Sequence, residues 1–230
     1  MPSRIVVLSG AGMSAESGIK TFRDADGLWE GHDVMEVASP QGWKNNKALV
    51  LDFYNQRRRQ LFEVEPNQGH LSLVQLEQKF QVDIVTQNVD NLHERAGSKN
   101  VLHLHGELIK ARSTNNPNLI IPWEKDILIS DKASDGHPLR PHIVWFGEAV
   151  PMIEKAVQIV NQADKVIIIG TSMQVYPAAS LVSFAPNHAE IYYIDPRPSI
   201  SYELQHLPRL QVIEETASKA VPVLVNTLLN

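Results

Sequence analysis

Hydrophobic residues along the chain gather in short runs that end in polar or glycine-containing turns. The first run, residues 5–8, has four consecutive apolar residues, three of them β-branched. Such a run predicts a strand buried on both faces, which is typical of parallel sheets covered by helices. Comparable runs predict strands at residues 82–86, 101–106, 143–146, 165–169 and 191–194.

Between these strands, apolar residues recur at helical spacing. The predicted helices cover residues 44–63, 70–80, 151–163, 178–184 and 218–229. Strands that alternate with helices imply right-handed crossovers and one parallel sheet. The predicted fold class is therefore α/β, a Rossmann-like doubly wound sheet. Residues 109–140 lack this alternation and contain two turn-forming clusters, so we interpret them as a small, loop-rich insertion.

One charged residue interrupts the apolar face of the helix predicted over residues 44–63. That face consists of Val50, Phe53, Tyr54, Arg57 and Leu61, at i, i+3, i+4, i+7 and i+11. Arg57 beside Tyr54 on a buried face would need an anion as partner, and the alternative is a side chain that snorkels from the edge of the face. Arg58 and Arg59 point elsewhere and are interpreted as solvated charges.

Composition narrows the classes of function. With 230 residues, 43% of them hydrophobic, the chain is long enough for one sizeable domain, or for a main lobe with a small insertion. The net charge of -5 argues against a nucleic-acid partner. No apolar run reaches about 18 residues, so no membrane span is expected. The absence of cysteine excludes disulfides, thiolate nucleophiles and cysteine-based zinc sites, and makes the cytoplasm the expected compartment.

The turn after the first strand has the form of a dinucleotide-binding loop. Gly10, Gly12 and Ala15 match G-x-G-x-x-G/A directly after an apolar strand, where the next helix would offer amide donors to a pyrophosphate. A merely structural turn is the alternative. The dehydrogenase version also needs a second strand that ends in an acidic residue, and Asp24 and Asp26 lie in a mixed loop instead. We therefore predict a dinucleotide site without the hydride-transfer layout.

Two further predicted strands end in polar residues, at the edge where α/β sheets bind ligands. Gln87, Asn88 and Asp90 follow the strand over residues 82–86 and would grip a ribose and a carboxamide; an ordinary Asn/Asp turn is the alternative. His103 and His105 share one face of the next strand. This pair would serve as metal ligands only with a third ligand, which is not evident, so a general base is the preferred interpretation.

Taken together, these strand-end motifs resemble the sirtuins, the NAD-dependent protein lysine deacylases, over nearly the whole chain. The motifs are residues 10–19 with Phe22 and Arg23, Pro66-Asn67 with His70, residues 86–91, His105-Gly106, Pro141 with Val144 and residues 146–148, and residues 170–172. The resemblance implies a single catalytic domain. Its Rossmann lobe would cover approximately residues 1–30, 64–107 and 140–230, and a smaller loop-rich and helical lobe residues 31–63 and 108–139.

The resemblance also implies a mechanism in which acyl-lysine peptides or proteins and NAD are the substrates. The acyl oxygen attacks the ribose carbon that bears nicotinamide, nicotinamide leaves and an alkylimidate forms. His105 then acts as general base on the ribose hydroxyls, and the products are lysine and O-acyl-ADP-ribose. Asn88 and Asp90 would orient nicotinamide and its ribose, and Phe22 would shield the reactive carbon.

The same resemblance assigns two sets of binding residues. Those expected to bind NAD are Gly10, Ala11, Gly12, Ser14, Ala15, Glu16, Phe22, Arg23, Trp29, Gln87, Asn88, Asp90, His105, Gly170, Thr171, Ser172, Tyr193, Asp195 and Ala217. Those expected to bind the acyl-lysine substrate are Tyr54, Arg57, Val144, Trp145 and Phe146, the last three through an added peptide strand.

The spacing of Tyr54 and Arg57 resembles the Tyr-x-x-Arg signature of the sirtuin branch that removes succinyl and malonyl groups. A guanidinium and a phenol are suitable donors for a carboxylate at the end of an acyl chain. We therefore expect a preference for acidic acyl groups, with weaker deacetylation.

Two departures from the family pattern stand out. Most sirtuins hold a structural zinc with four cysteines, whereas this chain has none, and Ser113 lies about where the first would be. We therefore expect no metal; a replacement site that includes His137 is remote. Tyr193 occupies the place of an Asn that usually contacts the adenine ribose, which affects the expected affinity for NAD.

Three other functions stay open at this point. ADP-ribosyl transfer or NAD hydrolysis would break the same bond to nicotinamide without acyl-lysine. An NAD-binding sensor would have lost catalysis, although it would not need the base His105. A hydride-transfer dehydrogenase fits least. We expect a monomer with no nucleic-acid or membrane partner.

Overall fold

The structure is a computed structural model that describes residues 2–20, 28–29 and 31–230. The predicted site residues Phe22 and Arg23 lie outside the described residues. No helix within these ranges is long and apolar enough to cross a membrane.

The larger sheet has six parallel strands, as the fold class predicts. Their order across the sheet is β11 (Leu210–Ile213), β10 (Glu190–Ile194), β9 (Lys165–Ile169), β1 (Arg4–Ser9), β4 (Gln81–Thr86) and β5 (Val101–His103). The first strand of the chain is therefore central, with β4 on one side and β9 on the other. The sequence prediction missed β11, because this edge strand is half exposed and lacks a continuous apolar run.

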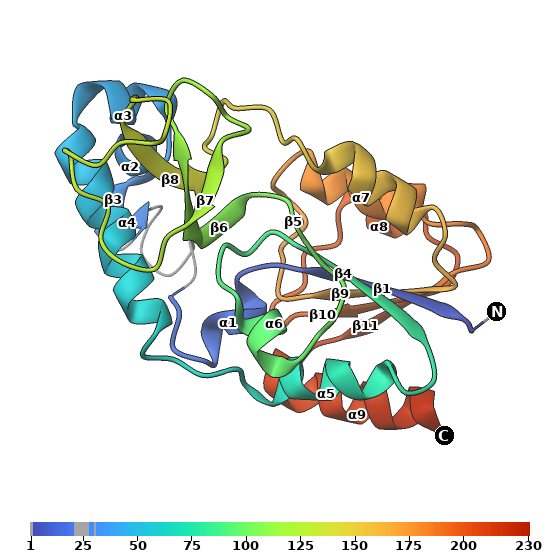
Figure 1. Cartoon of the computed structure of the whole chain (residues 1–230). Helices are drawn as coiled ribbons and strands as arrows, with labels where there is room; N and C mark the ends of the chain where they lie inside the picture. Colours follow the sequence, from blue (N-terminus) through green and yellow to red (C-terminus); the bar gives the residue numbers. More distant parts are fainter. Residues whose placement is uncertain (1, 21–27, 30) are drawn as a thin grey trace.

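Helices cover both faces of this sheet, which explains the unbroken apolar runs. Figure 1 shows α5 (Gln68–Leu76) and α9 (Ala217–Leu229) side by side below the sheet, and α7 (Ile153–Val160) and α8 (Tyr202–Gln205) above it. Within β1, Ile5 and Val7 belong to the core with α9, whereas Val6 and Leu8 belong to the opposite core with α7 and the 3-10 helix η1 (Ala178–Phe184).

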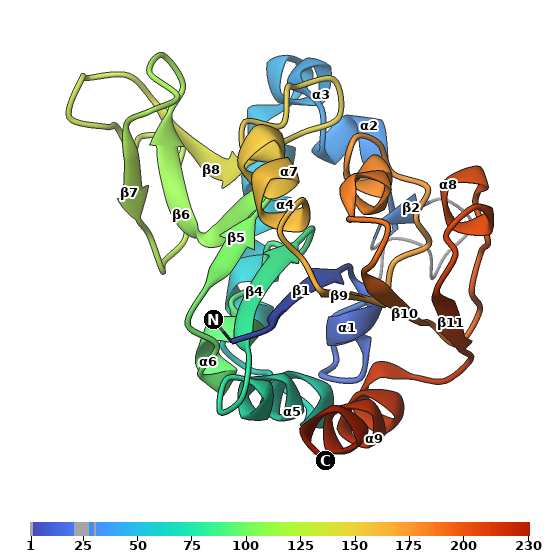
Figure 2. The ribbon, with the colours of Figure 1, turned by 90° about the vertical axis from the view of Figure 1, so that its right-hand side faces the viewer.

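A second sheet of three antiparallel strands lies apart from the first, as Figure 2 shows for β6, β7 and β8. These strands are β6 (Gly106–Ser113), β7 (Ile120–Pro122) and β8 (Leu139–Ile143). The segment interpreted as loop-rich thus contains regular structure. Its alternation is hidden by a register shift in β6 between Gly106 and Ala111, and by the charged side chains of Lys110 and Arg112.

The strand predicted at residues 143–146 is also wrong. Its first residue instead ends β8, which pairs antiparallel with β6 and does not join the parallel sheet. An apolar run does not indicate which sheet its strand joins, because the pairing depends on strands that are distant in the sequence. The predicted lobe boundaries stay a prediction.

Helices and a short hairpin pack beside the antiparallel sheet. These elements are β2 (Leu28–Trp29), β3 (His32–Asp33), α2 (Val34–Val37), α3 (Pro40–Asn45) and α4 (Lys47–Leu61). The single helix predicted over residues 44–63 is in fact α3 followed by α4. Asn46 separates the two helices, because its side-chain oxygen accepts a hydrogen bond from the Leu49 backbone N–H at 3.0 Å and so caps α4. Two short helices, α1 (Gly12–Ala15) and α6 (Leu92–Ala96), complete the structure.

Candidate active site

The turns after β1 and β9 pack against each other where the strand order reverses, the usual ligand site of such sheets. The Gly10 N–H donates to the Ile169 carbonyl at 3.0 Å, and the Gly12 N–H donates to the Gly170 carbonyl at 2.8 Å. A Cβ on Gly10 would lie 2.7 Å from the Thr171 side chain, and one on Gly12 would lie 2.6 Å from the Gly170 Cα. The two predicted glycines are therefore required for this crossing.

The helix that follows the turn is short, and its first amides are hydrogen-bonded within the chain. Helix α1 is a single turn, and the N–H groups of Gly12, Met13 and Ser14 all donate to nearby carbonyls. These three amides thus have acceptors within the chain, and the pyrophosphate site stays a prediction. The Glu16 carboxylate accepts hydrogen bonds from the N–H and hydroxyl of Ser218, at the start of α9, while Ala11 and Ala15 stay partly or fully exposed.

Three predicted residues, one from α1 and two from the turn after β4, form one buried cluster. The Asn88 amide donates to the Ser14 hydroxyl at 3.1 Å, and that hydroxyl donates to the Asp90 carboxylate at 2.9 Å. The other oxygen of Asp90 accepts from the Leu92 N–H at 3.1 Å. Burial raises the pKa of Asp90 above its ordinary value.

His105 has the hydrogen bonding of a general base. Its Nδ1 lies 3.0 Å from the Gln87 carbonyl, which is an acceptor only, so Nδ1 carries the proton and Nε2 is the basic nitrogen. Burial lowers the pKa of His105, and the bond to Gln87 offsets only part of that shift. The imidazole is therefore mainly neutral at pH 7.

His103 differs from His105 although both come from the same H-x-H motif. Its Nδ1 lies 2.9 Å from the Asn88 carbonyl, and its Nε2 lies 2.7 Å from the Glu94 carboxylate. Burial alone would lower its pKa, but Glu94 outweighs burial and the pKa is raised. His103 thus fixes the backbone of Asn88, a positioning role. No cluster of metal-ligating side chains occurs among the described residues.

A buried polar network lies behind this cluster, and sequence reasoning missed it. The Ser9 hydroxyl donates to the Thr86 hydroxyl oxygen at 2.9 Å, and that oxygen also accepts the Asn88 N–H at 3.0 Å. His93 Nε2 lies 2.9 Å from the Ser9 oxygen, and its ring contacts the ring of His70 with centroids 4.9 Å apart. In the sequence, the only signal for this network was a polar residue at the end of an apolar strand.

On the predicted adenosine side, the turn after β9 is held by one side chain from the turn after β4 and one from β10. The Gln87 amide donates to the Thr171 hydroxyl at 3.1 Å, and the Tyr193 hydroxyl donates to the Thr171 carbonyl at 2.9 Å. Tyr193 is fully buried, so its side chain supports this turn from within the core. Asp195 accepts the Arg197 N–H at 2.8 Å, and Ala217 is the buried first residue of α9.

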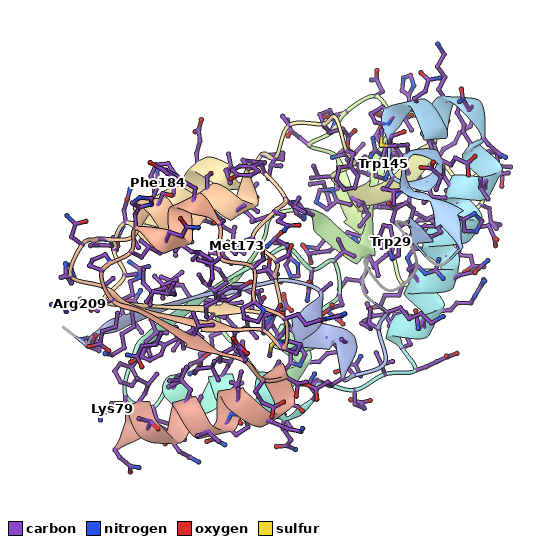
Figure 3. All side chains as sticks on the ribbon, turned by 180° about the vertical axis from the view of Figure 1, so that it is seen from behind. Trp29, Lys79, Trp145, Met173, Phe184 and Arg209 are labelled. Carbon is purple, nitrogen blue, oxygen red and sulfur yellow. The ribbon has the colours of Figure 1, made fainter. Side chains whose placement is uncertain are left out.

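On the predicted acyl side, Tyr54, Arg57, Trp29 and Trp145 come together around α4. Figure 3 shows Trp29 and Trp145 in the same lobe, next to this helix. The Tyr54 hydroxyl is fully buried and accepts a hydrogen bond from Trp145 Nε1 at 3.0 Å, and the Trp29 ring meets the Tyr54 ring edge-on. The Arg57 guanidinium stacks over the Phe53 ring, 4.4 Å from its centroid.

A small cavity lies between this region and the Asp90 cluster. Its volume is about 40 Å³, and Arg57, Trp29, Val89 and Asp90 are among the residues that line it. Arg57 of α4 and Asp90 after β4 thus line the same space, although they are far apart in the sequence.

Arg58 is not the solvated charge that the sequence analysis expected. Its side chain is buried, with Nε donating to the Leu108 carbonyl and Nη1 to the Asn55 side-chain oxygen, both at 2.7 Å. Burial lowers its pKa to about 10. The helical spacing of apolar residues did not predict this contact, because β6 packs on a second face of α4. Arg59 is exposed and pairs with Asp126, as expected.

The segment expected to pair with a peptide uses its backbone N–H groups within the chain. Val144 donates to the His105 carbonyl, Trp145 to the Glu148 carboxylate and Phe146 to the Ala38 carbonyl, each at 2.9 Å. These bonds connect β8 to the His105 turn and to α2.

Ser113, expected near the missing zinc site, is the centre of a hydrogen-bonded turn. Its hydroxyl donates to the Asp135 carboxylate at 2.7 Å and accepts the N–H groups of Asn115 and Asn116 at 3.0 and 3.2 Å. The neighbouring apolar core includes Leu51, Ala111, Ile127, Ala133 and Leu139.

Comparisons with known proteins agree with the fold and with the motifs. The model of the Sir2 family matches residues 10–177. A protein of Helicobacter pylori named NAD-dependent protein deacylase is 62% identical over 226 residues, which are 98% of this chain and 97% of that protein. A protein of Bacteroides thetaiotaomicron with the same name is 53% identical, over 98% of this chain and 97% of its own length.

Solved structures give the same result. A Sir2 homologue in complex with NAD is 36% identical, with a TM-score of 0.86, and the match covers 99% of this chain and 90% of that one. A mutant Sir2 homologue with ADP-ribose matches with a TM-score of 0.89 at 36% identity, over 99% of this chain and 92% of that one. The predicted family is thereby confirmed: the chain belongs to the Sir2 family, the sirtuins.

Proposed function

We propose that this protein removes acyl groups from lysine side chains of proteins in an NAD-dependent reaction, and that it prefers succinyl and malonyl groups to acetyl. The observation that carries the proposal is the shared cavity, which Arg57 and Asp90 both line. The names of the two bacterial relatives support the deacylase activity. The acyl preference is supported by the side chains around α4.

The residues present fit NAD. The crossing of Gly10 and Gly12 against Gly170 leaves no room for a Cβ, so backbone atoms would line the dinucleotide side. Bound NAD supplies an electrophilic ribose carbon once its bond to nicotinamide breaks. Asn88 and Asp90, fixed by Ser14, would orient the nicotinamide end, and Gln87 and Thr171 would contact the rest of the nucleotide.

His105 would accept a proton from a ribose hydroxyl. The Gln87 carbonyl holds the tautomer with a basic Nε2, and the lowered pKa keeps this nitrogen unprotonated at pH 7. A sensor that only bound NAD would have no use for such a base.

Arg57 and Tyr54 would bind the carboxylate of an acidic acyl group. A guanidinium forms strong, charge-assisted hydrogen bonds to a carboxylate, and a phenol is a further donor. An acetyl group has no carboxylate and would gain nothing from either side chain.

Product analysis by mass spectrometry tests this function against its alternatives. The purified chain would be incubated with NAD and succinyl-, malonyl- or acetyl-lysine peptides. We expect nicotinamide, free lysine and O-acyl-ADP-ribose, most rapidly from the acidic acyl peptides. ADP-ribosylated protein, or ADP-ribose formed without acyl-lysine, would indicate transfer or hydrolysis instead. Absence of turnover with every peptide would indicate an NAD-binding module without catalytic activity.

The acyl preference has a separate test in Arg57→Met, with the exposed Arg59→Met as matched control. Losing a charge-assisted hydrogen bond of about 1.5–3 kcal/mol should lower kcat/KM for the succinyl peptide roughly tenfold or more, relative to the acetyl peptide. Arg59→Met should leave this ratio within about twofold, because its partner Asp126 is exposed. Equal loss for both peptides in Arg57→Met would refute the acidic pocket.

We also propose that the protein is a cytoplasmic monomer without a nucleic-acid partner. The net charge of -5 and the absence of cysteine support this proposal. Size-exclusion chromatography with light scattering should give a mass close to that of one chain.

A further inference from the structure

The Tyr54 hydroxyl is buried, and its set of hydrogen-bond partners is unusual for a buried group. Its oxygen accepts the indole N–H of Trp145 at 3.0 Å, and an indole nitrogen is a donor only. The phenol proton must therefore point elsewhere, yet within the described part of the chain no acceptor contacts it. Burial also raises the pKa of Tyr54 well above its ordinary value, so this proton is kept at every physiological pH. A buried donor without an acceptor is costly.

The Trp145 indole, which donates to the Tyr54 hydroxyl, is itself held in place by several contacts. The Arg140 guanidinium stacks on the Trp145 ring, 3.3 Å from its centroid, and Trp43 packs on it with centroids 5.7 Å apart. Arg140 donates to both oxygens of Glu148, at 2.7 and 3.2 Å. Glu148 also accepts the backbone N–H of Trp145. The position of Nε1 is therefore set by an ion pair and a backbone bond as well as by packing.

The missing acceptor has the same chemistry as the proposed substrate. Arg57 lies one turn beyond Tyr54 on α4 and lines the cavity shared with Asp90. A carboxylate beside Arg57 is an acceptor only, so it would take the phenol proton. If the indole N–H were absent, the phenol would be free to reorient or to bind water.

We propose that Trp145 is a specificity-determining positioning residue, whose indole N–H directs the Tyr54 hydroxyl proton toward the carboxylate of an acidic acyl group. This inference rests on the proposed acyl preference and deepens it. It gives the side chain of Trp145 a function separate from any backbone contact with a peptide.

The test compares Trp145→Phe, Tyr54→Phe and the double variant, with Trp43→Phe as matched control from the same aromatic cluster. The quantity measured is the ratio of kcat/KM for succinyl- and acetyl-lysine peptides with NAD. We expect Trp145→Phe to lower this ratio about fivefold to tenfold, as for one lost hydrogen bond. The double variant should be no lower than Tyr54→Phe, because one substitution acts through the other. Trp43→Phe should change the ratio less than about twofold, since it leaves the bond to Tyr54 in place.

A second replacement guards against a simple packing defect. Benzothienylalanine incorporated at position 145 keeps the size and shape of the indole but has sulfur in place of the N–H. It should lower the ratio as much as Trp145→Phe does. A normal ratio with benzothienylalanine would overturn the inference, and so would a Trp145→Phe effect that persists undiminished in the Tyr54→Phe background.

Failure of the inference is distinguishable from failure of the proposed preference. The preference fails if the wild-type chain cleaves succinyl-lysine no better than acetyl-lysine. The inference concerns the change of the ratio on loss of the N–H, which is measured whatever the wild-type ratio is. Equal losses on both peptides would overturn it even if the preference is real.

Discussion

The histidines beside the candidate site show how the contacts of one residue decide its chemistry. His103 lies against the Glu94 carboxylate and its pKa is raised, whereas His105 Nδ1 lies against the Gln87 carbonyl and burial lowers the pKa of His105. Burial lowers the pKa of His70 to about 4 and holds that of His93 well below its ordinary value. Sequence spacing treated His103 and His105 alike, because the contacts that distinguish them come from other parts of the chain.

The pH dependence of activity should follow His105. Its imidazole is active when neutral, and protonation at falling pH removes the base. The acid limb of kcat/KM should therefore lie below 6.5, the ordinary value for histidine, because burial lowers the pKa of His105. The limb should also move to lower pH on warming, since imidazole ionisation is endothermic. A limb that does not move with temperature would point to a carboxyl such as Asp90 instead.

His93 should affect catalysis without touching substrate. The Ser9 hydroxyl donates its proton to the Thr86 oxygen, so the Ser9 oxygen accepts from His93, and His93 Nε2 carries the proton that it donates. His93→Leu removes this donor and loosens the Ser9–Thr86 support of Asn88. We expect the rate of nicotinamide release to fall about tenfold or more, with less than about threefold change in KM for NAD.

His93→Gln is the conservative partner of that variant. The amide nitrogen of Gln reaches about the position of imidazole Nε2, so it should keep kcat within about threefold of wild type. Thermal unfolding of both variants separates this effect from a loss of folded protein. Equal impairment by Gln and Leu would mean that ring packing matters and the bond to Ser9 does not.

At the scale of single elements, α4 illustrates what a helical pattern contains and what it omits. The face of Val50, Phe53, Tyr54 and Leu61 is buried as the spacing predicts. The contact of Arg58 with β6 could not be predicted, because it depends on a strand about 50 positions away in the chain. For the same reason, the sequence predicts five of the six parallel strands but not the antiparallel sheet, whose strands carry buried arginines paired with Glu148.

Arg58→Met should destabilise the fold, whereas Arg59→Met should not. The first change leaves the buried Leu108 carbonyl without its donor, at a cost of about 1–3 kcal/mol in the free energy of unfolding. Arg59 and Asp126 form an exposed ion pair, and such pairs contribute roughly 0–1 kcal/mol. Urea unfolding of the two adjacent variants measures the difference. Similar midpoints would show that the buried guanidinium adds no net stability.

At the scale of the whole molecule, the candidate site lies where the two sheets meet in the chain. β5 ends at His103, His105 follows, and β6 begins at Gly106. The Val144 N–H then bonds the His105 carbonyl from the far end of β8. Strand ends such as Asn88, Asp90 and His105 were predictable, because α/β sheets gather ligands there. Their mutual contacts were not, since each bridges separate loops.

The stability of the antiparallel sheet should not depend on a metal. In the described part of the chain, the Ser113 hydroxyl stabilises a turn of this sheet. It donates one hydrogen bond to Asp135 and accepts two from backbone N–H groups. A chelator should therefore leave the melting temperature unchanged. Ser113→Ala should lower it by about 2–4 °C, because two backbone donors lose a buried acceptor worth roughly 1 kcal/mol. Thr114→Ala, at the exposed neighbouring residue, should have little effect. A chelator that lowers the melting temperature, or one zinc ion retained per purified chain, would show that a metal has replaced the cysteine site after all.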